Sequence, residues 1–246
     1  MVRAHAGGGR EILTRALLVS ALVLLGCASV ANSRMLPTDH RAQLVYAALG
    51  DSTVEGVGAS SSETSYPSRL LSRLRGAYRD VRLVNLGKGG ATSADVLANQ
   101  LDRAVALSPH LITLSIGPND ITERIPVETY ERNLTAIFGG LAEKTPAVVV
   151  VNLIPDLAVT PRFRGKPQEA AVGKLTTTFN DALRRRARAA GAEIVDLYGP
   201  SRDEVPRRPA LLSKDGYHPS DAGYERWAEL MWQGVLKRIR IGKGAV

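Results

Sequence analysis

Apolar residues between residue 43 and the end of the chain follow two patterns that alternate. Short apolar runs over residues 43–49, 81–86, 111–116, 147–153 and 193–197 have the length of buried strands. After each run, apolar side chains recur every three or four residues, over 68–79, 94–107, 127–143, 169–190 and 221–239, which predicts helices. Five strands that each lead into a helix predict the α/β class, as a three-layer α/β/α domain around a five-stranded parallel sheet. No linker interrupts the pattern, so we expect one domain over residues 43–241.

Polar segments gather at the predicted carboxyl ends of the strands, where open parallel sheets bind their ligands. Three of them directly follow strands, and the fourth precedes the last helix. They are Gly50-Asp51-Ser52, residues 85–90, Gly117-Pro118-Asn119-Asp120 and Asp215-Gly216-Tyr217-His218-Pro219. The longest irregular stretches, residues 53–67 and 155–166, follow strand ends at the same edge. We therefore expect a functional site there.

The first residues have the pattern of an export signal rather than of a folded element. Three arginines precede an apolar run over 16–25, which is too short to cross about 30 Å of hydrocarbon as a helix. The run ends in Leu24-Leu25-Gly26-Cys27, which resembles a bacterial lipobox. That resemblance implies a signal peptide over 1–26, a lipid on the Cys27 sulfur and a polar tether over 27–42.

Two other interpretations of this segment remain open. Ser29-Val30-Ala31 forms a small-x-small site for ordinary cleavage after Ala31, and the apolar run also suits an uncleaved anchor. All three interpretations export the chain. The lipobox interpretation adds attachment to the cell envelope, so the predicted location is exported and membrane-associated.

Composition narrows the classes of function. Of 246 residues, 44% are hydrophobic and 23% charged, which excludes a disordered chain, and a single cysteine excludes an internal disulfide. The net charge of +8 comes from scattered arginines without interleaved aromatic residues, so we do not expect nucleic acid as a partner. No paired histidines suggest a metal ligand set, so no metal or other cofactor is predicted.

A serine hydroxyl at the predicted edge needs a base before it acts as a nucleophile, and histidine suits that task near neutral pH. The chain has four histidines. His5 falls in the signal segment, His40 in the tether, and His110 at the amino end of a predicted strand. Only His218 lies on a loop at the active edge, three residues after Asp215, a carboxylate suited to holding the second ring nitrogen.

Taken in order, the four segments resemble the SGNH hydrolase family, also called GDSL esterases and lipases, over about residues 44 to 236. The resemblance implies a flavodoxin-like fold and a serine esterase with Ser52, His218 and Asp215 as its catalytic triad. It also implies an oxyanion hole built from the Ser52 and Gly90 backbone N–H groups and the Asn119 side chain. Gly87 and Gly89 fit the glycine position less well. Pro118 departs from the family pattern, and it has no N–H to donate.

Each segment alone also has an ordinary explanation. Ser52 after Asp51 is typical of a helix cap, Asn119-Asp120 of a turn, and the stretch from His218 to Asp221 of a helix start. We assign structural roles to Asp51 and Asp120, which we expect to orient their loops. The joint occurrence of all four segments in order favours the hydrolase.

The expected substrates are small-molecule, glycan or lipid esters, with a preference for short acyl groups. Few loop apolar residues and three phenylalanines indicate no deep long-chain pocket. Basic residues over 156–168 suit either an anionic substrate such as a lysophospholipid or an ordinary solvated loop. Two rival functions use the same cleft: an acyltransferase, and a non-catalytic protein that binds envelope glycans or lipids. Nothing in the sequence indicates the oligomeric state.

Overall fold

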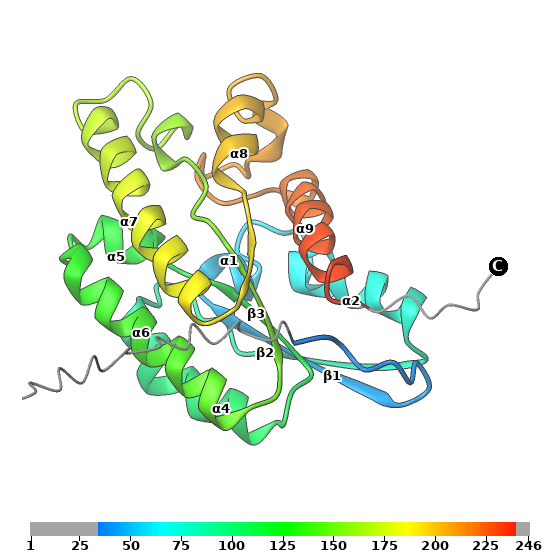
Figure 1. The fold of residues 1–246 in the computed structure, drawn as a ribbon. Coiled ribbons are helices and arrows are strands. Elements are labelled where there is room, and N and C mark those ends of the chain that lie inside the picture. Colours follow the sequence, from blue (N-terminus) through cyan, green and yellow to red (C-terminus); the bar gives the residue numbers. More distant parts are fainter. Residues whose placement is uncertain (1–33, 240–246) are drawn as a thin grey trace, which may run out of the picture. The chain divides into compact units, whose positions relative to one another are not determined.

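A parallel sheet of five strands forms the centre of the part of the chain that the computed structural model describes, residues 34–239 (Figure 1). Its strands, in chain order, are β1 (Gln43–Gly50), β2 (Asp80–Asn85), β3 (Leu111–Ser115), β4 (Val148–Asn152) and β5 (Glu193–Val195). Their spatial order is β2-β1-β3-β4-β5, and every neighbouring pair is parallel. The predicted α/β class and parallel sheet are confirmed.

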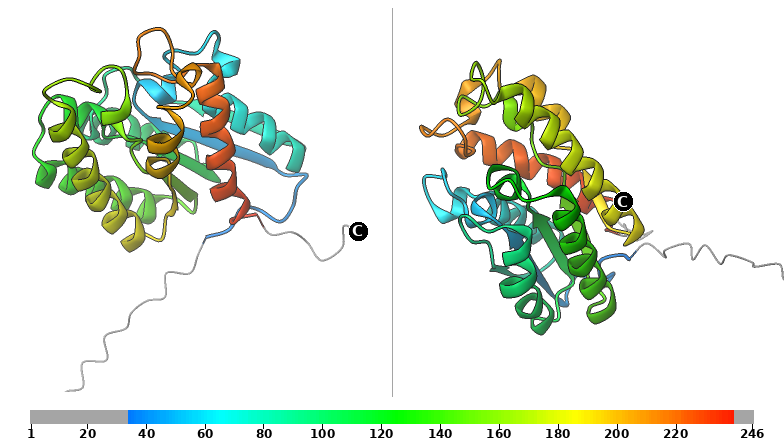
Figure 2. Two further views of the ribbon diagram at one scale, coloured as in Figure 1. Left: turned by 90° about the horizontal axis from the view of Figure 1, so that it is seen from above. Right: turned by 90° about the vertical axis from the view of Figure 1, so that its left-hand side faces the viewer.

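Helices cover both faces of the sheet, as its strands require because each is buried on both sides. On one face lie α2 (Tyr66–Ala77) and α9 (Asp221–Leu236). On the other lie α4 (Leu101–Ala106), α6 (Val127–Lys144) and α7 (Glu169–Ala189), as the views in Figure 2 show. The side chains of β1 alternate between the two apolar cores. Tyr46 and Ala48 join the first, and Ala47 and Leu49 join the second.

Short helical elements at the sheet edges lack the periodicity that predicts longer helices. They are α1 (Ser52–Glu55), α5 (Pro118–Thr122), α8 (Tyr198–Glu204), and 3₁₀ turns at Ser62–Thr64, Leu157–Val159 and Pro209–Leu211. The single helix expected over 94–107 is divided instead. It begins as α3 (Ser93–Asp95), passes through a π-helical turn (Val96–Gln100) and continues as α4.

Residues 34–42, expected to belong to the tether, instead pack against the domain. The Arg34 guanidinium donates to the carbonyls of Ala142 and Thr145, at 2.7 and 2.6 Å, where α6 ends. Leu36 is buried, and its backbone N–H donates to the Arg238 carbonyl at 2.7 Å. These contacts lie at the amino ends of the strands, so the chain enters the domain at the edge opposite the strand carboxyl ends.

The predicted signal peptide over 1–26, with the lipidation site at Cys27, lies outside the described residues. So does the alternative cleavage point after Ala31. Among the helices that the structure describes between residues 34 and 239, none is long and apolar enough to cross a membrane.

Leu36→Ala tests whether residues 34–42 belong to the domain. Loss of a side chain that is 2% exposed is expected to lower the free energy of unfolding by about 2–4 kcal/mol. Leu236→Ala, at a leucine 40% exposed on α9, is the matched control and is expected to change stability by less than about 0.5 kcal/mol. Chemical denaturation measures both variants. Equal small changes would contradict the docking of this segment.

Candidate active site

The turn between β1 and α1 presents Ser52 at the carboxyl edge of the sheet. Gly50 has a φ of +143°, and a Cβ there would lie 1.9 Å from the Ser115 carbonyl oxygen of β3, so no other residue fits. The Asp51 side chain caps α1 by accepting from the Thr53 backbone N–H at 2.9 Å and from its hydroxyl at 2.8 Å. Ser52 therefore stands on the first turn of a short helix whose direction is fixed.

Ser52, His218 and Asp215 form a continuous line of hydrogen bonds. The Ser52 Oγ lies 2.9 Å from His218 Nε2, and His218 Nδ1 lies 2.6 Å from Asp215 Oδ2. With Nδ1 as the protonated nitrogen, the imidazole donates to the carboxylate and leaves Nε2 to accept from the serine hydroxyl. The structure thus brings together the three residues that the sequence indicated for the triad.

Asp215 is held by its own loop. Its Oδ1 accepts the backbone N–H groups of Tyr217 and His218 at 2.8 and 2.9 Å, and the Ser213 hydroxyl at 2.8 Å. Burial opposes ionisation of this carboxyl, but the hydrogen bonds outweigh it and hold the pKa of Asp215 well below its usual range. The ionised form of this side chain is therefore favoured, which suits the partner of an imidazolium.

The two other histidines within residues 34–239 have structural partners. His110 accepts the Val45 backbone N–H on its Nδ1 at 3.0 Å, at the amino edge of the sheet. The His40 ring packs on Tyr78 with the centroids 4.6 Å apart. Neither lies with Ser52, as the order of the sequence segments indicated.

The segments that carry Gly90 and Asn119 are linked to each other. The Asn119 amide donates to the Ala91 carbonyl at 2.9 Å. Buried Asp120 accepts the Ser93 backbone N–H at 3.0 Å and the Ser93 hydroxyl at 2.5 Å. Gly90 has a φ of +78°, and a Cβ there would meet nothing within 4 Å, so its backbone is open to an approaching group. Among residues 34–239, no acceptor takes the N–H of Ser52 or Gly90.

Asp51 and Asp120 differ from Asp215 in their electrostatics. Burial raises the pKa of Asp51 to about 6, although hydrogen bonds from Thr53 lower it. Burial likewise raises the pKa of Asp120 against its bonds from Ser93. Each carboxyl accepts a backbone N–H group and so holds a loop in place, which is the structural role that we expected for both.

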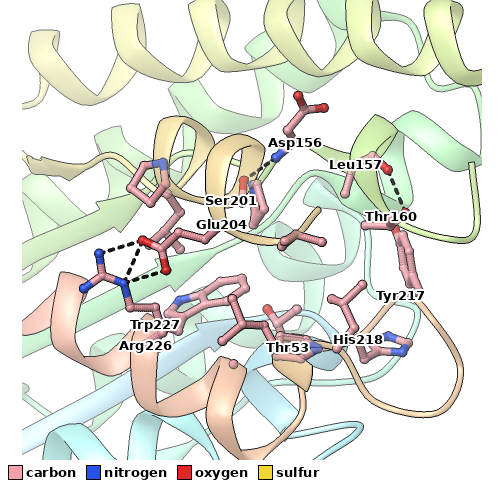
Figure 3. A pocket seen from close by; sticks show the side chains of 18 of the residues that line it. Thr53, Asp156, Leu157, Thr160, Ser201, Glu204, Tyr217, His218, Arg226 and Trp227 are labelled. Atoms are coloured by element: carbon pink, nitrogen blue, oxygen red, sulfur yellow. Dashed lines mark hydrogen bonds and ion pairs between the residues drawn. The ribbon is translucent and has the colours of Figure 1, made fainter. Parts of the chain in front are cut away.

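An apolar cavity of about 100 Å³ opens beside Ser52 and His218 (Figure 3). One end is bounded by an ion pair in which Arg226 of α9 contacts Glu204 of α8 at 2.8 Å. The apolar lining comes from the loop after β4, from α8, from the turn at Pro209–Leu211 and from α9, and it comprises Pro155, Leu157, Pro200, Val205, Leu211, Leu212, Trp227 and Leu230. Sequence reasoning missed this cavity because most of its residues lie outside the motif segments.

The basic loop after β4 packs against the triad loop. The Arg162 guanidinium lies 4.5 Å from the centre of the Tyr217 ring, next to His218 in the chain, and its backbone N–H donates to the Gly216 carbonyl at 3.3 Å. Such a contact is favourable without any ligand. Within residues 34–239, no group of three or more histidine, cysteine or acidic side chains is arranged to hold a metal ion.

Comparisons with known proteins place the site in a wider context. The model of the GDSL-like lipase/acylhydrolase family matches residues 48–226. The chain is 25% identical to an arylesterase of Vibrio mimicus, over 89% of this chain and 98% of the relative. It is 24% identical to the esterase TesA of Pseudomonas aeruginosa, over 86% and 96%. The crystal structure of Axe2, an acetylxylan esterase from Geobacillus stearothermophilus, has the same fold, with a TM-score of 0.63, 20% identity, and coverage of 78% of this chain and 93% of that one.

The raised pKa of Asp51 makes stability depend on pH. Because the folded state holds this proton more tightly than the unfolded chain, this group's contribution to the free energy of unfolding falls as pH rises from about 4 to about 6. Asp51→Asn has no such titration. The free energy of unfolding of the variant minus that of the natural protein should therefore rise by about 2–3 kcal/mol between pH 4 and pH 7. Any fixed cost of the amide is independent of pH. Thermal unfolding of both proteins across this range measures the difference, and a constant difference would contradict the assignment.

Proposed function

The chain belongs to the GDSL-like lipase/acylhydrolase family and is a hydrolase that acts on ester bonds; from this premise we propose that Ser52, His218 and Asp215 hydrolyse carboxylic esters through an acyl-enzyme. The observation that carries the proposal is the line of hydrogen bonds from Asp215 through His218 to the Ser52 hydroxyl, with heavy atoms 2.6 and 2.9 Å apart. These distances suit transfer of the serine proton to the imidazole.

The proposed reaction has two halves. Ser52 Oγ attacks the carbonyl carbon as its proton passes to His218 Nε2, and the C–O bond to the alcohol then breaks as His218 returns that proton to the leaving oxygen. Water next attacks the acyl-enzyme with His218 as base, and the acid departs as Ser52 regains its proton. Asp215 stays ionised and stabilises the imidazolium in both halves.

The tetrahedral intermediate of each half carries a negative oxygen that needs donors already in place. We assign the Ser52 and Gly90 backbone N–H groups and the Asn119 side-chain amide to this oxyanion hole. Support comes from the open backbone at Gly90, from the unused N–H groups, and from the bond between Asn119 and the Ala91 carbonyl. That bond uses one of the two amide hydrogens, and the other is left for the oxyanion.

We place the acyl group of the substrate in the apolar cavity beside Ser52. A dry apolar cavity of about 150 Å³ takes up benzene, so about 100 Å³ suits an acyl chain of about four carbons. The proposed substrates are therefore short-chain esters, and an arylesterase and an acetylxylan esterase are among the proteins to which the chain is similar. The positive charge of Arg162, in the basic loop after β4, lies against the Tyr217 ring, so its position needs no anionic substrate.

Export and lipid attachment at Cys27 remain proposals from the sequence alone. The docking of residues 34–42 at the opposite edge of the sheet is compatible with an attachment that leaves the site unobstructed. The mass of the mature N-terminal peptide tests it, because a lipid on Cys27 and cleavage after Ala31 give different masses.

Ser52→Ala tests the nucleophile. Hydrolysis of p-nitrophenyl butyrate should fall by at least about 10⁴-fold, because the acyl-enzyme cannot form, while the melting temperature stays within about 2 °C. A fluorophosphonate probe should label the natural protein on Ser52 alone. Ser62→Ala, at an exposed serine of the turn Ser62–Thr64, is the control and should retain full activity and labelling. Retained turnover in Ser52→Ala would refute the mechanism.

The test for an acyltransferase uses the same assay with an added alcohol acceptor. Hydrolysis predicts free acid as the main product at every acceptor concentration. A transferred ester that displaces the acid would instead assign the acyl-enzyme to transfer.

Val205 on the wall of the cavity allows a matched pair of variants for the acyl site. The natural protein should prefer butyrate to acetate esters by about tenfold in kcat/KM, at about 0.8 kcal/mol for each buried methylene. Val205→Phe should remove this preference while acetate turnover persists, and Val205→Ala should shift it toward hexanoate. Rates on esters of two to twelve carbons measure the shift. The same chain-length profile in both variants would contradict the placement of the acyl group in this cavity.

A further inference from the structure

The last residue of β1 has a backbone N–H that the sheet itself does not satisfy. The pairing of β1 with β2 ends at Ala48 and Asn85, and the Leu86 N–H donates to the Ala48 carbonyl at 2.8 Å. The N–H and C=O of Gly50, two residues further on, point toward the same side. The Lys88 N–H, just beyond β2, donates to the C=O at 3.1 Å, but within residues 34–239 no backbone carbonyl accepts the N–H. A buried backbone group needs a partner, so another part of the chain must supply one.

Gln100 supplies the missing acceptor and also bonds to the carbonyl. Its Oε1 accepts the Gly50 N–H at 2.8 Å, and its Nε2 donates to the Gly50 carbonyl at 2.8 Å. The side chain is 3% exposed, so water does not compete for these bonds. One side-chain amide thus gives the Gly50 N–H its acceptor and adds a second donor to the Gly50 carbonyl.

The π-helical turn over Val96–Gln100 accounts for the direction of this side chain. The Leu101 N–H bonds to the Val96 carbonyl, five residues back rather than four. Each residue advances an α-helix by about 100°, so the wider turn resets which side chains face the sheet. Val96 at the start of the turn and Leu101 and Ala104 after it remain in the core. Gln100, at the end of the turn, reaches Gly50.

The Gly50 carbonyl joins the two loops to which we assign the backbone donors of the oxyanion hole. It also accepts the Lys88 N–H at 3.1 Å, two residues before Gly90. Ser52 follows Gly50 by two residues. Gly50 is thus one of the links between the two loops, beside the bonds from the Asn85 side chain to the Val54 carbonyl and from the Gly89 N–H to the Glu55 carboxylate. Gln100 holds Gly50 by both its N–H and its C=O.

We propose that Gln100 is a positioning residue that keeps these two N–H groups at the spacing which the oxyanion requires. The inference rests on the proposed esterase mechanism and extends it beyond the residues that touch the substrate. Gln100 acts through Gly50. Its loss is expected to weaken stabilisation of the transition state more than binding of the ester.

Asn180 on α7 makes the same pair of bonds at a different strand and so gives a matched control. Its Oδ1 accepts the Ile154 N–H at 2.7 Å, and its Nδ2 donates to the Ile154 carbonyl at 2.9 Å, beyond the end of β4. The side chain is 1% exposed. The two amides perform the same structural task, but only Gln100 bonds to the segment that leads into Ser52.

The experiment compares Gln100→Leu with Asn180→Leu. Gln100→Leu leaves the Gly50 N–H unpaired while the Gly50 carbonyl keeps its bond from Lys88, and Asn180→Leu leaves the N–H and C=O of Ile154 unpaired, so both should lower the melting temperature. On p-nitrophenyl acetate, kcat of Gln100→Leu should fall by at least about tenfold with KM changed less than about threefold. Asn180→Leu should keep kcat within about threefold. Equal losses of kcat in both variants, or none in Gln100→Leu, would overturn the proposal.

Gln100→Glu keeps the experiment decisive if Gln100→Leu does not fold. A protonated carboxyl can donate to the Gly50 carbonyl, whereas a carboxylate cannot. The ratio of kcat in Gln100→Glu to kcat in the natural protein should therefore fall as rising pH ionises the introduced carboxyl. A ratio that does not vary between pH 5 and pH 9 would count against Gln100. If the natural protein hydrolyses no ester at all, the proposed function is wrong. That result is distinct from a failure of the Gln100 proposal, which requires an active natural protein.

Discussion

Every buried backbone N–H and C=O must find a partner, and this requirement governs the carboxyl edge of the sheet. Parallel strands of unequal length leave unpaired groups where one strand outlasts its neighbour. At β1 the Gln100 amide fills the gap, and at β4 the Asn180 amide fills it. The loops that begin at these strand ends are therefore tied to helices on the face of the sheet that α4, α6 and α7 cover. Ser52 is positioned by this framework rather than by its own contacts alone.

Three aspartates organise the loops at this edge, and each accepts backbone N–H groups of its own or a neighbouring loop. Asp51 caps α1, Asp120 binds Ser93, and Asp215 binds the segment that contains His218. The three carboxyls differ in pKa. Burial raises the pKa of Asp51 and Asp120, whereas hydrogen bonds to Asp215 keep the pKa of that carboxyl low. The carboxylate beside the imidazole is thus the one whose ionised form is favoured, and the other two hold the loops in place.

The fold was largely predictable from the sequence, because the signals for it are local. Apolar runs and helical spacing mark the strands and long helices, and the order of those elements implies a parallel sheet. The divided helix over 93–106 was not predictable, since a π-helical turn has no periodicity of its own and depends on the partner that Gln100 finds at Gly50. Residues 34–42 were misjudged as part of a tether. Their polar composition suits either a tether or a docked strap, and the Arg34 and Leu36 contacts settle which it is.

The sequence by itself determined the chemistry of the site: a serine, a histidine and a carboxylate in segments that end at one sheet edge. The order of segments determines this, because the strand before Ser52 ends at the carboxyl edge of the sheet and the last helix, directly after His218, starts at that same edge. Only the tertiary structure decided what surrounds these groups. The apolar cavity draws on α8, the turn at Pro209–Leu211 and α9, some 150 residues or more beyond Ser52, and the raised pKa of Asp51 reflects complete burial. Burial and shape depend on which distant segments pack together, and no local pattern of residues records that.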